Sequence, residues 1–206
     1  MVSPGGHIGA FQSQFDAYIF GSGNPVRSIR QIQLGQTINQ EVVELIMQNG
    51  RVVIRDGRLK DRLKAVRIWH EFMDYHKRIS SMDNEMVDKA GEMWMQYFER
   101  HVRSPMRKAL IAEQDGEVTG FLLGEIQKRP PIFKASHQAF VDSIGVAESK
   151  RNQGVGGLML DCFAKWAREK GAPCIMLNVV VENAPAIRLY EKHGFKTMIL
   201  SQRKLL

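Results

Sequence analysis

Apolar residues between positions 51 and 200 recur in two patterns. In some stretches they return every three or four residues, which is typical of an amphipathic helix. In others they form short β-rich runs that end at Gly or Pro, which is typical of a strand. The first pattern predicts helices over residues 59–79, 86–102, 155–170 and 183–192. The second predicts strands over residues 51–55, 106–113, 117–127, 137–146, 172–181 and 195–200.

The resulting order is β-α-α-β-β-β-α-β-α-β. Consecutive strands joined by a tight turn, such as Asp115-Gly116, pair antiparallel, whereas a helix between two strands favours a parallel pair. We therefore expect an α/β (α+β) fold with a mixed, mostly antiparallel sheet flanked by helices and a parallel pair near its C-terminal half. Residues 51–206 are expected to form this domain.

The first 50 residues differ from the rest of the chain. They contain seven of the 18 glycines and five charged residues. Residues 37–40 have the pattern of a capping box, and the apolar residues that follow keep helical spacing as far as Asn49-Gly50. We expect residues 1–50 to be an N-terminal extension with one helix near 37–49.

Charge narrows the possible partners. Lys and Arg number 29 against 22 Asp and Glu, which gives a formal charge of +7, and residues 51–206 hold 27 of the basic and 19 of the acidic residues. This excess favours an anionic partner, but basic and aromatic residues are not interleaved, so no nucleic acid is expected. No apolar run approaches the ~20 residues of a membrane span, and the N-terminus lacks a signal-peptide pattern. We expect a cytoplasmic protein without a membrane partner.

Both cysteines, Cys162 and Cys174, have apolar neighbours. Two cysteines cannot form a disulfide framework, and their spacing does not match a Cys/His zinc site, so no metal is expected. We expect both thiols to be buried and unreactive, which argues against a cysteine nucleophile.

A glycine-rich loop, Arg151–Gly157, lies between the predicted strand 137–146 and the predicted helix 155–170. Glycines let the backbone approach a ligand closely, and the N–H groups of a helix's first turn favour an anion such as a pyrophosphate. A Walker loop would end in Gly-Lys-Ser/Thr, but Leu158 follows Gly157. A dinucleotide fingerprint would need a third glycine at Met159 and would open the first helix of the chain. Neither of these two phosphate-binding motifs is expected.

The pattern R-x-x-G-x-G over Arg151–Gly156, just after I-G-V at 144–146, resembles the acetyl-CoA pyrophosphate loop of the GNAT superfamily of N-acetyltransferases. About 30 residues later, the stretch Asn183–Phe195 resembles the second signature of that family: a helix with Asn at its start, Tyr near its end and Gly-Phe before the next strand. The resemblance covers about residues 51–200 and includes the order of the elements.

This resemblance implies that acetyl-CoA is the co-substrate. It also implies that the strand before the loop separates from the next strand at a bulge, which frees backbone groups for the pantetheine. A glycine inside a strand, at position 145, suits a bulge or a close approach. The implied cofactor-binding residues are Ile144, Gly145, Val146, Arg151, Asn152, Gln153, Gly154, Val155, Gly156, Gly157, Asn183 and Tyr190.

Acetyl transfer to an amine needs a donor for the thioester oxygen, a proton for the leaving thiolate and a base for the amine. The resemblance implies that the Val146 N–H is the oxygen's donor. Tyr190 is the expected general acid, because a phenol stays protonated at neutral pH. Tyr190 could instead only pack against the cofactor or the core, and Asn183 could be only a helix N-cap.

Asp142 is the expected base. Alternation along a strand puts Asp142 on the same face as Ile144 and Val146, and many relatives have a carboxylate at the matching site. Glu125 and His137 are alternatives, and water could also relay the proton.

The expected function is therefore N-acetyl transfer from acetyl-CoA to a primary amine, directly in a ternary complex. The alternative is a catalytically silent GNAT-like module that binds CoA or regulates. The amine, on a small molecule or a protein, is expected to contact the first two helices and the 128–136 loop. Relatives usually have a further strand after the last one predicted here, so we expect either residues 201–206 or a partner chain, in a homodimer, to complete the sheet.

Overall fold

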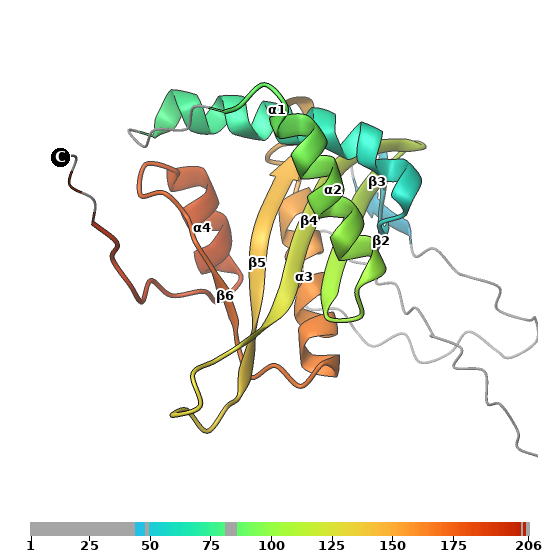
Figure 1. The fold of residues 1–206 in the computed structure, drawn as a ribbon. Helices are drawn as coiled ribbons and strands as arrows, with labels where there is room; N and C mark the ends of the chain where they lie inside the picture. Colours follow the sequence, from blue (N-terminus) through green and yellow to red (C-terminus); the bar gives the residue numbers. More distant parts are fainter. Residues whose placement is uncertain (1–43, 48–49, 81–85, 203, 205–206) are drawn as a thin grey trace, which may run out of the picture.

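The computed structural model describes residues 44–47, 50–80, 86–202 and 204, and within them it has one six-stranded sheet with helices on both faces (Figure 1). The strands are β1 (Glu44–Met47), β2 (Gly50–Asp56), β3 (Arg107–Gln114), β4 (Glu117–Lys128), β5 (His137–Val146) and β6 (Ile175–Leu177). The helices are α1 (Arg62–Ile79), α2 (Ala90–Arg103), α3 (Val155–Glu169) and α4 (Ala184–Lys192), with 3-10 turns η1 (Leu59–Asp61) and η2 (Glu148–Lys150).

Strands β1 to β6 lie side by side in chain order. Each neighbouring pair from β1 to β5 is antiparallel, and β5 and β6 are parallel because α3 connects them. The predicted mixed, mostly antiparallel sheet with a parallel pair near its C-terminal half is confirmed. None of the described helices is long and apolar enough to cross a membrane.

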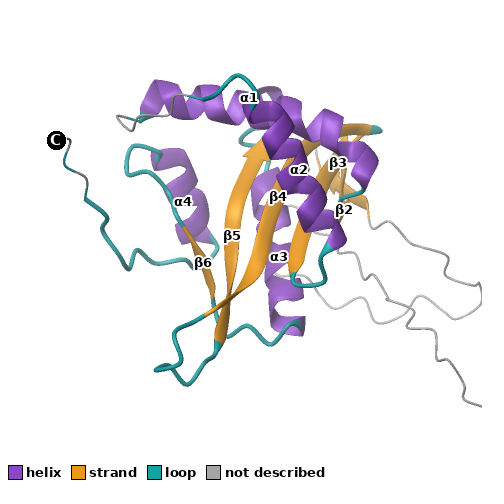
Figure 2. Cartoon of the chain, viewed as in Figure 1, coloured by secondary structure: helices purple, strands orange, loops and turns teal. Residues whose placement is uncertain are grey.

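Helices α1 and α2 cover one face of the sheet, and α2 crosses it in front in Figure 2. The buried residues of α2 are Trp94, Phe98 and His101, which follow helical spacing on the side that meets β3 and β4. Trp94 stacks on Trp69 of α1 with ring centroids 5.6 Å apart. Both tryptophans belong to the core of this face.

Helix α3 covers the opposite face and lies behind the sheet in the same view. Its buried side chains, including Met159 and Phe163, pack with Leu122 of β4 and Val141 of β5. The approach is close, because a Cβ at Gly124 would come within 2.6 Å of the Phe163 ring. Tyr190 of α4 completes this core beside β5.

The predicted helix near 37–49 is wrong where the structure describes it. Residues Glu44–Met47 form strand β1, which pairs antiparallel with β2 from Glu44↔Val53 to Met47↔Gly50. These four residues, one polar and then three apolar, are too short a run to distinguish the two elements, and the available edge of β2 favours the strand. The rest of the predicted helix lies outside the described residues, and the boundary of the N-terminal extension at residue 50 stays a prediction.

Two predictions at the C-terminal end also need correction. The strand expected over 172–181 is only Ile175–Leu177, and residues 195–200, expected to be the final strand, form no regular element. A strand needs a partner for its backbone groups, and no described strand pairs with residues 195–200. In Figure 1 this segment runs away from α4 and the sheet.

Candidate active site

The parallel pair of strands β5 and β6 is short. Its register runs from Ala139↔Ile175 to Val141↔Leu177 and stops there, whereas β5 continues to Val146. Residues 143–146 therefore have a strand partner on the β4 side, and no described strand pairs with them on the other side. This part of β5 is an open strand edge.

The backbone groups of Ile144 and Val146 point toward this open edge. The Ala147 N–H donates to the Thr119 carbonyl at 2.9 Å, and the Gly145 carbonyl also lies against β4. Backbone groups alternate in direction along a strand, so the N–H and C=O groups of Ile144 and Val146 face away from β4. The edge thus offers the donors and acceptors that an extended amide-containing ligand needs.

A β-bulge in β5 sets this direction. The register with β4 changes from Gly124↔Val141 to Leu123↔Ser143, so Asp142 is the extra residue. The bulge expected near Gly145 thus lies three residues earlier. Gly145 is instead a site of close approach, since a Cβ there would lie 2.6 Å from the Phe121 ring.

The glycine loop joins β5 to α3 through η2. Gly154 has φ +82° and is the N-cap of α3, so the helix begins directly at Val155. Asn152 also has a positive φ, of 61°, a conformation that Asn tolerates better than most residues. The first-turn N–H groups of a 15-residue helix lie at this end, which favours an anionic group. Gln153 contacts the Ser149 carbonyl and so stabilises the loop itself.

Two of the glycines also have packing reasons. A Cβ at Gly157 would lie 2.5 Å from Nε2 of His193, and one at Gly156 would lie 3.0 Å from Leu189. Both contacts are with α4 or the residue that ends it. A Cβ at Gly156 would also lie 4.0 Å from the side chains of Ile144 and Val146. The start of α3, the end of α4 and the open edge of β5 therefore meet here.

Arg151 connects the loop to two other elements. Its Nε donates to the Val146 carbonyl at 3.1 Å, and its guanidinium lies 5.0 Å from the ring centroid of Tyr75 on α1. Glu71, also on α1, accepts from the Glu148 N–H at 2.8 Å. Helix α1 is therefore attached to the loop at two points, which the sequence alone did not indicate.

Helix α4 brings Asn183 and Tyr190 to the same region. The Asn183 Oδ1 accepts from the Ala186 N–H at 3.2 Å, so this residue is the N-cap that was one of its two expected roles. Tyr190 is 9% exposed, and its ring lies 5.8 Å from that of Phe195. Burial raises the pKa of its phenol to about 12. Tyr190 therefore remains protonated throughout the neutral and mildly alkaline range.

Asp142 does not lie on the face that strand alternation indicated. Ile144 and Val146 pack toward α3, whereas the bulge directs Asp142 toward α2, where its Oδ2 lies 2.9 Å from Nε2 of His101. The Tyr97 hydroxyl donates a second hydrogen bond to this carboxylate. Burial, with the charges of Asp142 and Glu125, raises the Tyr97 pKa to about 12.

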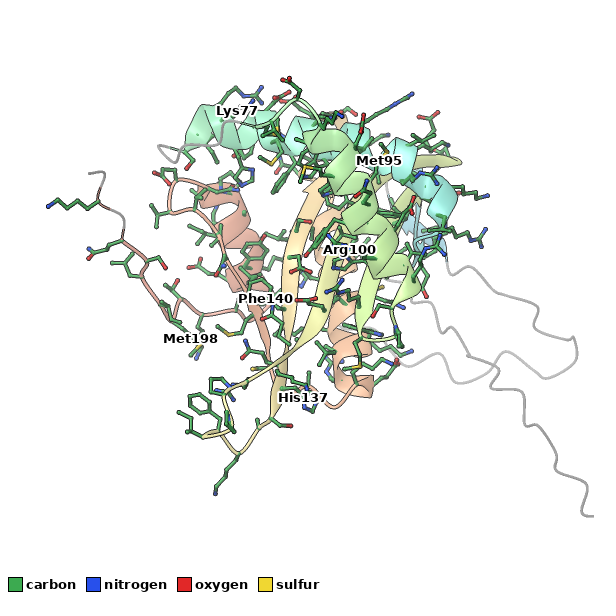
Figure 3. All side chains as sticks on the ribbon, viewed as in Figure 1. Lys77, Met95, Arg100, His137, Phe140 and Met198 are labelled. Atoms are coloured by element: carbon green, nitrogen blue, oxygen red, sulfur yellow. The ribbon has the colours of Figure 1, made fainter. Side chains whose placement is uncertain are left out.

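The structure places the two alternative bases, Glu125 and His137, in different positions relative to the open edge of β5. Glu125 lies next to this group but is paired with Arg107, whose Nε is 2.9 Å from Oε2. His137 begins β5, nine residues from Val146, which corresponds to about 30 Å of strand. Figure 3 shows His137 beside the 129–136 loop, at the end of β5 far from α1. His137 is therefore too distant to serve the open edge.

His101 is a residue that sequence reasoning missed. A signal was present, because residues 94, 98 and 101 follow one helical stripe and a polar residue on a buried stripe needs a partner. His101, Glu125 and Asp142 also bring ligand-type atoms within 4.8 Å of one another. The Arg107 guanidinium at Glu125 already supplies positive charge there, which disfavours a cation.

The cysteines are only partly as expected. Burial raises the pKa of Cys162 to about 11, which fits an unreactive thiol. Cys174 is exposed, in contrast to the prediction that it is buried, because β6 begins one residue later and covers little of this segment. Neither Cys162 nor Cys174 is one of the candidate site residues named in the preceding paragraphs.

These features together suit acetyl-CoA. A helix N-terminus and Arg151 are appropriate for a pyrophosphate, and the unpaired edge of β5 is appropriate for the amides of pantetheine. Tyr190 supplies a protonated hydroxyl close to the same core cluster.

Comparison with known proteins supports this. The sequence profile of the acetyltransferase (GNAT) family matches residues 67–195. An L-amino acid N-acetyltransferase of Escherichia coli is 36% identical over 151 residues, which are 70% of this chain and 83% of that protein. An N-alpha-acetyltransferase of Sulfurisphaera tokodaii is 35% identical over 108 residues, 48% of this chain and 63% of that protein.

A similar fold occurs in a predicted acetyltransferase of Clostridium acetobutylicum whose crystal structure contains acetyl-CoA. Its TM-score is 0.60 at 18% identity, and the match covers 74% of this chain and 96% of that one. Acetyl-CoA is the co-substrate of GNAT acetyltransferases. The profile match over most of the domain, the relatives and the architecture agree that this chain belongs to the GNAT family of acetyltransferases.

Proposed function

We propose that this protein transfers an acetyl group from acetyl-CoA to a primary amine, directly and without a covalent enzyme intermediate. The observation that carries the proposal is the open edge of β5, where pairing with β6 stops at Val141 while Ile144 and Val146 direct their backbone groups outward beside the glycine loop. The buried, protonated Tyr190, in the core cluster against which Ile144 and Val146 pack, supports transfer over binding alone.

The residues that hold acetyl-CoA in this proposal lie on three elements. The first-turn N–H groups of α3, preceded by Gly154, bind the pyrophosphate together with Arg151. The backbone groups of Ile144 and Val146 bind the pantetheine, and Arg151 gives up the Val146 carbonyl as they do so. Asn183 contributes its amide nitrogen, since its Oδ1 caps α4.

When bound, acetyl-CoA supplies the acetyl group as a reactive thioester. The Val146 N–H donates to the thioester oxygen and stabilises the negative charge that develops there. Tyr190 donates the hydrogen bond that the departing sulfur requires, and Asp142 accepts a proton from the acceptor ammonium. Of the two N–H protons that the ammonium loses, one ends on the CoA sulfur and the other in solvent.

The acceptor reaches the edge from the face that α1 and α2 cover, because Asp142 and Tyr97 lie on this side. The E. coli relative is named for amino acids and the Sulfurisphaera relative for α-amino groups. We therefore propose free amino acids and peptide N-termini as the first acceptors to test, with a polyamine and an aminoglycoside as contrasts.

The experiment has two stages. Acetyl-CoA should raise the melting temperature of the protein, and CoA thiol release should then be measured with each amine of the panel. A thermal shift followed by amine-dependent thiol release is the expected result. A thermal shift without turnover for any amine would favour the silent CoA-binding module, and no shift would contradict acetyl-CoA binding.

A further inference from the structure

His101 is unusually well fixed for a polar side chain in a core. It is 1% exposed, and both ring nitrogens are engaged. Nδ1 lies 2.9 Å from the Tyr97 carbonyl one turn earlier in α2, and Nε2 lies 2.9 Å from Oδ2 of Asp142. The ring thus connects a helix on the acceptor side to the bulge of β5.

These two contacts determine how many protons the pair holds. A carbonyl oxygen can only accept, so Nδ1 must donate and carries a hydrogen. In a neutral ring Nε2 would then have a lone pair, which cannot bond to the lone pairs of an ionised carboxylate. One additional proton must lie between Nε2 and Oδ2, either on an imidazolium or on a carboxylic acid. The pair of His101 and Asp142 is therefore electrically neutral as a unit.

The other charged and titratable groups around the pair agree with this assignment. Tyr97 of α2 donates to Asp142, and Glu125 of β4 is paired with Arg107 of β3. Among the described residues, His101 is the basic side chain in contact with Asp142, at 2.9 Å, and the two form an ion pair when the ring is protonated. Arg107 is committed to Glu125, so the orientation of the Asp142 carboxylate depends on His101 and Tyr97.

Position explains why such support is needed. Asp142 is the extra residue of the bulge, so no side chain of β4 lies directly opposite it. The carboxylate is 13% exposed and would be free to turn toward water without a fixed donor. A base that is oriented by a third group is a recurring arrangement in enzymes.

We propose that His101 is a positioning residue for acetyl transfer, acting only through Asp142, whose carboxylate it holds toward the acceptor amine. This inference rests on the proposed function. In the supported step the shared proton is on Nε2 of His101, so Asp142 is a carboxylate. It takes one proton from the acceptor ammonium, which leaves an amine with a free electron pair and a neutral carboxylic acid. His101 keeps its own proton and contacts neither the amine nor acetyl-CoA.

The test is a double-mutant cycle. His101→Leu removes the donor, and Asp142→Asn keeps the hydrogen bond, because an amide N–H can donate to Nε2 of a neutral ring. We expect each single change to lower kcat/KM for the amine about 10- to 100-fold, the size of one hydrogen bond to a charged group. The double variant should be no worse than Asp142→Asn alone, and the Kd for acetyl-CoA should stay within about twofold throughout.

Two further variants separate positioning from packing. His101→Gln, which can still donate to Asp142, should recover most of the loss seen with His101→Leu. His76→Leu is the matched control, because His76 makes the same Nδ1 contact to a carbonyl one turn earlier, with Phe72 at 2.9 Å, on α1. This control should keep the wild-type rate. If His101→Leu does not fold, the cycle is run with His101→Gln, whose smaller loss should likewise vanish beside Asp142→Asn.

The possible outcomes are distinct. Losses that multiply in the double variant, or a His101 variant that weakens acetyl-CoA binding as much as it slows transfer, would overturn the positioning role. A wild-type protein that binds acetyl-CoA but acetylates no amine would overturn the proposed function, and the role of His101 with it.

Discussion

The replacement of Tyr190 by Phe tests how the sulfur is stabilised as it leaves. Tyr190 is 9% exposed and its pKa is about 12, because burial disfavours the phenolate. An ordinary thiol has a pKa of ~8.5, so complete proton transfer from this phenol to a thiolate would be uphill by roughly 3.5 units, or about 5 kcal/mol. The structure therefore favours a hydrogen bond to the sulfur in the transition state over early release of the proton.

The expected magnitude follows from that distinction. A hydrogen bond to a charged group contributes about 1.5–3 kcal/mol, which corresponds to a loss in kcat of roughly 10- to 150-fold for Tyr190→Phe. The phenyl ring keeps its contact with Phe195, so the Kd for acetyl-CoA should change less than about twofold. Because the phenol is still protonated at pH 10, its ionisation should not lower the kcat of the wild type up to that pH. The pH profiles of wild type and Tyr190→Phe should therefore have the same shape on the alkaline side.

The assay is CoA thiol release at saturating acetyl-CoA, over pH 6 to 10 as the working range, with calorimetry for the cofactor affinity. Tyr75→Phe is the matched control, since it removes another phenolic oxygen but keeps the ring over which Arg151 lies. Unchanged kcat in Tyr190→Phe would refute the hydrogen-bond role. A collapse of acetyl-CoA affinity would show instead that the hydroxyl serves binding.

Three further predictions concern stability and thiol reactivity. Gly124→Ala should lower the free energy of unfolding by about 1–3 kcal/mol in a denaturant titration, because its Cβ would lie 2.6 Å from a backbone oxygen and an aromatic ring. Gly91→Ala in α2 should be neutral or stabilising, because its Cβ would meet at 3.0 Å the ring of His70, an exposed side chain that can move, and alanine favours the helix. Asp61→Asn should cost about 1–3 kcal/mol, since the buried carboxylate loses charged hydrogen bonds from Arg55 and one from the Arg58 N–H, while Arg55 keeps its ion pair with Glu113. With a disulfide reagent at pH 8, Cys174 should react rapidly and Cys162 slowly, because only on the order of one thiol in a thousand ionises when its pKa is about 11.

The Asp61 effect should also depend on pH. Burial raises the Asp61 pKa, but hydrogen bonds from the Arg55 side chain and the Arg58 N–H outweigh burial, and the net pKa is lowered. The stabilisation is therefore present above about pH 4, the ordinary range of an Asp, and is lost as the pH falls below it. An Asp61→Asn variant as stable as the wild type at pH 7 would contradict this account of Asp61. A Gly91→Ala variant that loses as much unfolding free energy as Gly124→Ala would contradict the packing argument. Equal reaction rates for the two thiols would contradict the difference expected between Cys162 and Cys174.

Local patterns predicted most of the domain between residues 51 and 170, because each helix there has a buried stripe and each strand a neighbour in sequence. The strand His137–Val146 has the predicted bounds, and α3 differs from its prediction by one residue. The segments that failed depend on partners distant in sequence. Residues 44–47 form a strand because β2 is available, and residues 195–200 form none because no described strand accepts them.

The candidate site divides in the same way. Motifs with local sequence signatures, such as Arg151–Gly157 and Asn183–Phe195, were visible because their spacing is short. The pairing of Asp142 with His101 was not, because it joins residues 41 positions apart across a bulge. A bulge becomes visible only when both strands are in register, and alternation alone assigns the wrong face.

The position of Asp142 as an extra residue has a consequence for comparing this chain with its relatives. Downstream of the bulge the register with β4 is regular again, from Ser143 to Val146, so a chain without the extra residue could keep the same outward amides. In an alignment, such a chain would show a gap at this position rather than a substitution. The acetyl-CoA side of the site could then persist unchanged while the acceptor side lost its carboxylate through a single-codon deletion.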